Sequence, residues 1–276
     1  MVSIFFIFII GICIGSFLNV LIDRLPNNKS ILGRSHCEFC KKELKWKDLI
    51  PVASFVYLKG RCRYCHTPLS YQYPAVEIIT GVLFVSTYLI LISGGIFNFQ
   101  FSIFNEIINH KSLIISLVYY LIIVSAFIVV FFADLKYGII PDKILIPTAV
   151  ISLAYIAFSI FYPLSSNVQF SIFNHLLSAV AAFLFFLFIY LVTRGRGMGF
   201  GDVKLAFVIG LILGFPGIVL AIYIAFLTGG LVGIILILWK KKKLKSAVPF
   251  GPFLIIGAFT ALFFQNQIIS WIINLF

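Results

Sequence analysis

The sequence has little charge: charged residues make up 11% of its 276 residues, and only nine of them are acidic. A soluble globular domain carries roughly a quarter charged residues. Here apolar residues make up 62% of the chain and the mean hydropathy is +1.12, which excludes a single water-soluble domain. The shortage of charge predicts a bundle of helices that cross a lipid bilayer, each with roughly 17–25 apolar residues.

Cysteine is also scarce, and a basic N-terminal leader is lacking. Of the five cysteines, Cys13 lies alone in an apolar stretch, where we expect it to pack as a small apolar side chain. The other four form two pairs within one basic segment. Because no basic residue precedes the first apolar run, we expect no cleavable signal peptide.

Long apolar runs, in contrast, are abundant. We find eight of them: 3–22, 75–95, 113–133, 144–162, 172–192, 205–215, 216–238 and 252–274. The run 205–215 is short for a span, because a helix rises about 1.5 Å per residue and the hydrocarbon core is roughly 30 Å thick. The sequence predicts an all-α polytopic membrane protein with about eight transmembrane helices. We divide it into a first helix (1–22), a polar loop (23–73) and a transmembrane bundle (74–276).

The positive charges predict how this bundle is oriented. If the N-terminus lies outside and every run crosses, 20 of the 21 Lys and Arg residues fall on the cytoplasmic side. They then lie in four loops: 23–73, 134–143, 193–204 and 239–250. Cytoplasmic loops are enriched in Lys and Arg in just this way. The net charge of +12 therefore indicates a lipid bilayer as the partner, with no nucleic acid expected.

The two cysteine pairs predict a metal site in the first loop. Cys37-x-x-Cys40 and Cys62-x-x-Cys65 have the spacing of two zinc knuckles, which can place four thiolates around a tetrahedral Zn²⁺. Disulfides and free thiols are the alternatives, but disulfides rarely persist on the cytoplasmic side. With four protein ligands, the zinc would be structural. We expect a zinc-ribbon-like cytoplasmic loop.

Two of the nine acids stand where a pair could form. Asp134 ends the third apolar run and Asp202 opens the sixth, so the charge-derived topology brings both to the cytoplasmic face. Two close carboxyl groups cannot both ionise cheaply, so one can act as a base towards water and the other as an acid. Each aspartate alone would be explained as a helix cap or as a partner for Lys136 or Lys204. The pair is better explained by aspartic-dyad hydrolysis.

With these segments in order, the chain resembles the prepilin peptidase (type IV leader peptidase) family, membrane aspartic peptidases with a Gly-x-Gly-Asp motif. The segments that carry the resemblance are Gly-Ser-Phe-Leu-Asn-Val at 15–20, Arg-Leu-Pro at 24–26, the two cysteine pairs, Tyr-Pro at 73–74 with Glu77, Asp-Leu-Lys at 134–136, Ile-Pro-Asp at 140–142 and Gly-Met-Gly-Phe-Gly-Asp-Val-Lys-Leu at 197–205. Together they cover most of the chain.

The resemblance implies that Asp134 and Asp202 are catalytic. The supporting residues of the two motifs would be Gly199, Gly201, Lys136 and Lys204. Substrates would be prepilin or pseudopilin precursors with a short basic leader, a cleavage-site glycine and an apolar helix. The enzyme would lie in the cytoplasmic membrane of a prokaryote with its active site at the cytoplasmic face.

In members with the cysteine loop, the resemblance also implies N-methylation of the new N-terminus by S-adenosylmethionine. We take Ser16, Asn19, Tyr73 and Glu77 as candidates for the methyl-transfer region, although Ser16 and Asn19 could equally be helix-packing residues.

Three other functions stay open at this point. Intramembrane acids also carry protons or ions in transporters, but there they are expected near the midplane of broken helices. The chain could be a non-enzymatic assembly scaffold whose zinc and basic loops bind partners. It could also be a peptidase that lacks the methyltransferase activity.

Overall fold

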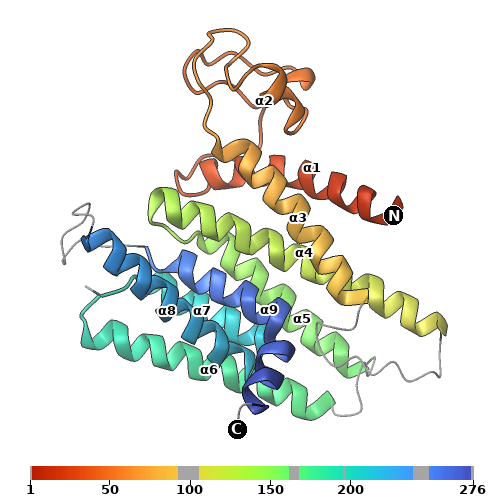
Figure 1. The fold of residues 1–276 in the computed structure, drawn as a ribbon, viewed down its shortest axis with the longest axis vertical. Coiled ribbons are helices and arrows are strands. Elements are labelled where there is room, and N and C mark those ends of the chain that lie inside the picture. Colours follow the sequence, from red (N-terminus) through yellow and green to blue (C-terminus); the bar gives the residue numbers. More distant parts are fainter. Residues whose placement is uncertain (1, 93–105, 162–167, 196, 239–248, 275–276) are drawn as a thin grey trace. The chain divides into compact units, whose positions relative to one another are not determined.

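The computed structural model describes residues 2–92, 106–161, 168–195, 197–238 and 249–274, and over these ranges it contains helices and no extended strand (Figure 1). Eight long helices match the eight predicted runs. They are α1 (Val2–Arg24), α3 (Gln72–Ile92), α4 (Glu106–Tyr137), α5 (Asp142–Phe161), α6 (Val168–Val192), α7 (Phe200–Leu213), α8 (Gly217–Leu238) and α9 (Gly251–Ile273). Between α1 and α3 lie two short helices, η1 (Trp46–Asp48) and α2 (Ala53–Tyr57).

Six of these helices are long and apolar enough to cross a membrane: α1, α3, α4, α6, α8 and α9. The two others, α5 and α7, are the remaining predicted runs. Helix α7 has 14 residues, which corresponds to about 21 Å at the usual helical rise and falls short of the hydrocarbon core. The all-α polytopic prediction is confirmed, and the chain is a multi-pass membrane protein. Most of the predicted cytoplasmic loop 239–250 lies outside the described residues.

The chain divides into two compact units. The first contains Met1–Leu89 and Tyr120–Val129. Within it, α1 and α3 approach so closely that a Cβ atom at Gly11 would lie 2.7 Å from the Cα atom of Gly81. Small residues at such crossings let helix backbones pack in a membrane, where the hydrophobic effect does not drive association.

The second unit contains Ile90–Tyr119 and Val130–Phe276, and α7 is its core. Helix α7 packs against α5, α6, α8 and α9, and its residues from Val208 to Leu213 are all buried. A helix that is apolar on every side can pack among other helices or face lipid, and here α7 packs among other helices. This explains how a short helix persists in the bundle and holds its N-terminus, with Asp202, at a fixed place.

Candidate functional site

The two cysteine pairs form two knuckles of the same design. In the first, the Cys37 amide donates to the Lys42 carbonyl and the Lys41 amide donates to the Cys37 carbonyl. The second repeats the pattern at Cys62, with Thr67 and His66 in the corresponding places. Short antiparallel bridges flank them, between His36 and Glu43 and between Arg61 and Pro68. The predicted zinc-ribbon-like loop is therefore present, with bridges in place of full strands.

The four sulfur atoms are gathered at one point. The ligand atoms of Cys37, Cys40, Cys62 and Cys65 all lie within 4.8 Å of one another, and the Cys37 and Cys65 sulfurs are 3.8 Å apart. Zn–S bonds of about 2.3 Å in a tetrahedron would place sulfurs about 3.8 Å apart. Hydrogen bonds from Thr67 lower the pKa of the Cys65 thiol to about 6, whereas, against a hydrogen bond from the Lys42 backbone, burial and the neighbouring Cys37 and Cys65 raise the pKa of Cys40 to about 11. The cluster fits a metal ion.

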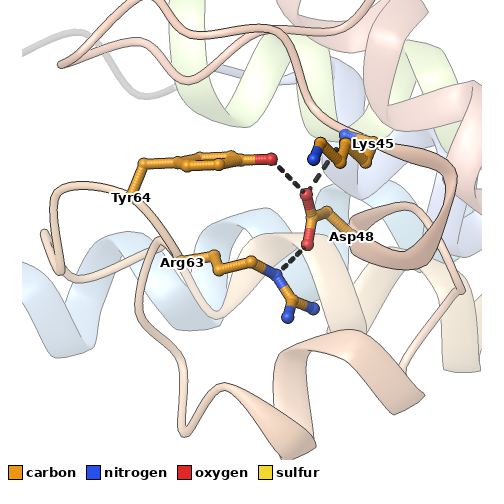
Figure 2. Close-up of polar contacts among 4 residues, drawn as sticks. All are labelled: Lys45, Asp48, Arg63 and Tyr64. Carbon is orange, nitrogen blue, oxygen red and sulfur yellow. Dashed lines mark hydrogen bonds and ion pairs between the residues drawn. The ribbon is translucent and has the colours of Figure 1, made fainter.

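Asp48, a half-buried residue whose side chain is 4% exposed, joins the second knuckle to η1 (Figure 2). The carboxylate of Asp48 accepts hydrogen bonds from the Arg63 guanidinium, the Tyr64 hydroxyl and the Lys45 backbone amide. Burial alone would raise the pKa of Asp48, but these donors, Arg63 first among them, hold it below its usual value. Sequence reasoning did not find these contacts, because the residues that form them are 3 to 16 positions apart and no motif joins them.

The four candidates for the methyl-transfer region lie together where the loop joins α1 and α3. The Asn19 side-chain amide donates to the Tyr73 carbonyl at 3.0 Å. The buried carboxyl group of Glu77 accepts a hydrogen bond from the Val52 amide at 2.6 Å, and Ser16 interacts with it electrostatically. The polar residues therefore connect α1, α3 and the loop.

Val52 has an unusual backbone at this junction. Its φ and ψ are 57° and −50°, and the Ala53 amide donates across it to the Pro51 carbonyl. This is a γ-turn of the rare, strained kind, and a β-branched residue with positive φ is a genuine outlier. The hydrogen bond from the Val52 amide to Glu77 holds the turn against α3.

The two predicted aspartates are both buried at helix ends. Asp134 lies in the last turn of α4, which ends where Gly138 takes φ +65° and donates its amide to the Asp134 carbonyl. Asp202 lies in the first turn of α7, where its Oδ2 accepts from the Gly199 amide at 3.1 Å. The side chains are buried, yet Asp134 Oδ2 and Asp202 Oδ1 have no hydrogen-bond partner. Buried polar atoms are rarely left in this state without a functional reason.

Ile140 and Gly251 complete this site. A Cβ atom at Gly251, the first residue of α9, would lie 2.5 Å from Asp134 Oδ2 and 3.2 Å from the Ile140 side chain. A Cβ atom at Gly201 would lie 3.1 Å from the same isoleucine. The charge of Asp134 also acts on Asp202. The ends of α4, α7 and α9 therefore bring the two carboxyl groups into one site.

Lys136 and Lys204, the two lysines of the motifs, have contacts with residues other than Asp134 and Asp202. The Lys204 ammonium pairs with both carboxylate oxygens of Asp142 at 2.8 Å, at the start of α5. Lys136 is exposed, with its ammonium 5.1 Å from the centre of the Tyr137 ring. Lys204 is thus paired with Asp142 and not with Asp202, whereas the hydrogen bond from the Gly199 amide to Asp202 is the helix-cap contact that the alternative explanation expected. Sequence reasoning missed Gly251, because a Gly-Pro at the start of an apolar run has no distinctive spacing to Asp134.

These features define a polytopic helical membrane protein with two buried carboxyl groups at helix ends and a four-cysteine cluster in its first loop. Comparisons with known proteins narrow the class. Residues 9–91 match the bacterial Peptidase A24 N-terminal domain, and residues 121–234 match the type IV leader peptidase family. The chain belongs to this family.

Three relatives are similar over nearly their whole length. The prepilin leader peptidase/N-methyltransferase of Bacillus subtilis (strain 168) is 32% identical over 100% of this chain and 99% of its own. Those of Legionella pneumophila and Aeromonas hydrophila are 30% and 28% identical, over 96% and 98% of this chain and 92% and 93% of their own. No solved structure matches the chain.

Proposed function

We propose that this protein cleaves the leader from prepilin-like precursors and then N-methylates the new N-terminus. The observation that carries the peptidase activity is the pair of buried carboxyl groups, each with one oxygen that has no hydrogen-bond partner. Full-length similarity to prepilin leader peptidase/N-methyltransferases supports the choice of substrate and the second activity.

In this proposal Asp134 and Asp202 share one proton and hydrolyse the peptide bond between them. The ionised carboxylate takes a proton from water, whose oxygen attacks the scissile carbonyl carbon, while the protonated carboxyl group donates to the carbonyl oxygen. The Gly199 amide, bound to Asp202 Oδ2, fixes that carboxyl group so that Oδ1 points to the substrate. Gly201 leaves room for an extended backbone at the start of α7.

The site should face the cytoplasm. Asp134 lies three residues before the end of α4 and Asp202 two residues after the start of α7, which is unlike the midplane acids of a transporter. A precursor whose basic leader stays inside by the positive-inside rule would present its cleavage site at this level. We therefore propose the cytoplasmic membrane of a prokaryote as its location and prepilin or pseudopilin precursors as its substrates.

We assign methylation to the region where the loop joins α1 and α3. The free α-amine, which exists only after cleavage, would take the methyl group of S-adenosylmethionine, leaving S-adenosylhomocysteine, and the methylated ammonium would release a proton to water. Ser16, Asn19, Tyr73 and Glu77 supply polar groups for this region. Zn²⁺ on the four cysteines would hold the loop folded.

The test uses the purified full-length protein and a pilin-like precursor, read by intact mass. Without S-adenosylmethionine the precursor should lose only its leader. With it, the shortened product should also gain one methyl group. An unchanged precursor under conditions where the enzyme is folded and zinc-loaded would refute the peptidase activity, and cleavage without methylation would refute the second activity alone.

A further inference from the structure

The second knuckle contains a cavity of about 420 Å³ that no step of peptide cleavage uses. Its lining residues come from one short segment: Leu58, Lys59, Arg61, Cys62, Arg63 and His66. Lys59, Arg61 and Arg63 carry positive charge there, His66 adds an imidazole, and Cys62 would be a thiolate of the proposed metal site.

Two of these cations lack a compensating acid. Arg63 is paired with Asp48, whose side chain is only 4% exposed. Lys59 and Arg61, in contrast, form no ion pair with an acid in the described ranges of the chain. An electropositive cavity of this kind favours an anion with several oxygen atoms, because guanidinium and ammonium groups bind phosphate through charge-assisted hydrogen bonds.

The positive charge of the cavity argues against its binding either S-adenosylmethionine or the leader of the precursor. S-adenosylmethionine has a sulfonium and an ammonium against one carboxylate and so is a net cation, and the leader of a prepilin-like precursor is basic. Like charges brought together without a compensating anion are unfavourable. The cavity therefore needs a different ligand, and phosphate groups lie nearby on the lipids.

The covalent structure keeps the cavity close to the bilayer. His66 is six residues before Gln72, where α3 begins, so it lies at most about 20 Å from that helix along the chain. The Val52 amide on Glu77 fixes the other side of the segment to α3. The cavity is thus within reach of the headgroup region beside its own membrane helix.

Exposed apolar side chains stand directly before the cavity. Val56 and Tyr57, in the last turn of α2, are 68% and 79% exposed. The Lys59 amide donates to the Val56 carbonyl and the Gly60 amide to the Phe55 carbonyl, which keeps Lys59 within one turn of them. Tyrosine next to Lys and Arg is typical of segments that lie in the membrane interface, where anionic lipids attract basic residues.

We propose that this cavity binds the phosphate headgroup of an anionic phospholipid, with Lys59 and Arg61 on the phosphate and Val56 and Tyr57 in the interface. The lipid would dock the zinc loop on the bilayer that surrounds its own helices. This inference depends on the membrane helices and not on the proposed peptidase activity.

The test compares zinc-loaded full-length protein in nanodiscs of phosphatidylcholine alone and of phosphatidylcholine with phosphatidylglycerol. Hydrogen–deuterium exchange of amides 57–66 should be slower with the anionic lipid. In Lys59→Gln/Arg61→Gln this difference should disappear, since each basic residue near an anionic surface contributes roughly fivefold. Lys41→Gln/Lys47→Gln removes the same charge from the same loop outside the cavity, and should keep the difference.

Zinc content verifies that each variant retains a folded loop. If the cavity variant loses zinc, Tyr57→Ser offers a second measurement, because it should reduce the lipid-dependent protection without changing any charge. The proposal would be overturned if amides 57–66 exchanged equally fast in both bilayers, or if both double variants lost the lipid-dependent slowing to the same extent. Protection in neutral bilayers by inorganic phosphate would assign the cavity to a soluble anion. Protection only by added precursor would assign the cavity to a protein ligand. Either result would also overturn the proposal.

Discussion

Among the acids near the proposed active site, the two aspartates of the dyad differ from Asp142 in what surrounds them. Asp142 is exposed and paired with Lys204, whereas Asp134 and Asp202 are buried with an oxygen unsatisfied. We expect Asp134→Asn and Asp202→Asn each to reduce cleavage by at least about 100-fold, the usual loss when an acid–base group is removed. Asp142→Asn should do much less damage. Near-normal turnover in either of the first two, measured by precursor cleavage, would refute the dyad.

Gly251 offers an independent test of the same site. In Gly251→Ala the new methyl group would lie 2.5 Å from Asp134 Oδ2, too close for the carboxyl group to stay in place. We expect cleavage to fall steeply while the bundle remains folded. Gly230→Ala is the matched control, because a Cβ atom there meets nothing within 4 Å. Both variants are compared by initial cleavage rate and thermal unfolding, and an equal effect of the two on cleavage would count against the proposed position of Asp134.

At this scale the sequence was informative where chemistry restricts the residue type. Asp134 and Asp202 could be predicted because acids are costly near a membrane, and the cysteines because two knuckles need a fixed spacing. The partner of Lys204 could not, since Asp142 is 62 residues away in sequence. Gly251 was missed for a similar reason: its role is to leave space, and an empty volume has no sequence pattern.

At the scale of elements, substitutions in the cysteine loop (residues 23–73) should affect methylation and cleavage to different extents. We expect Cys62→Ser to weaken methylation more than cleavage and to make the loop more sensitive to proteolysis, because four-thiolate zinc sites couple metal binding to folding. Both products are measured by mass in the same variant. Removal of zinc by a chelator should have the same effect. Equal loss of both activities, with the helices intact, would show that the loop braces the dyad.

Because the turn at Val52 is strained, we expect a Val→Gly substitution to change loop stability in opposite directions at positions 52 and 56. Val52→Gly should stabilise the loop by about 1 kcal/mol, because glycine adopts positive φ without the cost that valine has. Val56→Gly, in the regular helix α2, should destabilise it by about 1 kcal/mol. Exchange of the loop amides in the full-length protein measures both. Destabilisation in both variants would mean that valine at position 52 is not strained.

Most of the elements could be predicted because their apolar runs are long and separated from the next, although 205–215 is short and adjoins 216–238. Helix α4 is the instructive exception, since it runs from Glu106 to Tyr137 and so exceeds its apolar run 113–133 at both ends. Hydrophobicity marks the part of a helix that lies in lipid, and the helical hydrogen bonds can continue beyond it. The γ-turn at Val52 could not be predicted, because no propensity places valine at positive φ.

At the scale of the whole molecule, the charge distribution predicts the orientation. We expect both termini outside, and positions near 50, 138, 198 and 242 on the cytoplasmic side. Single cysteines introduced there in a Cys13→Ser background should resist a membrane-impermeant thiol reagent in intact cells, whereas a cysteine at position 165 should react. Efficient external labelling at 242 would remove α7 from the set of crossing helices.

The junction of α1 and α3 has a consequence for how the two helix ends are held together. The Tyr73 hydroxyl donates to Asp23, and the Asn19 amide donates to the Tyr73 carbonyl, so the two ends of the loop are fastened to each other beneath it. The segment between Asp23 and Tyr73 therefore begins and ends at nearly the same place. The contacts that hold the ends of α1 and α3 together are therefore made by these residues themselves and not by the segment between them.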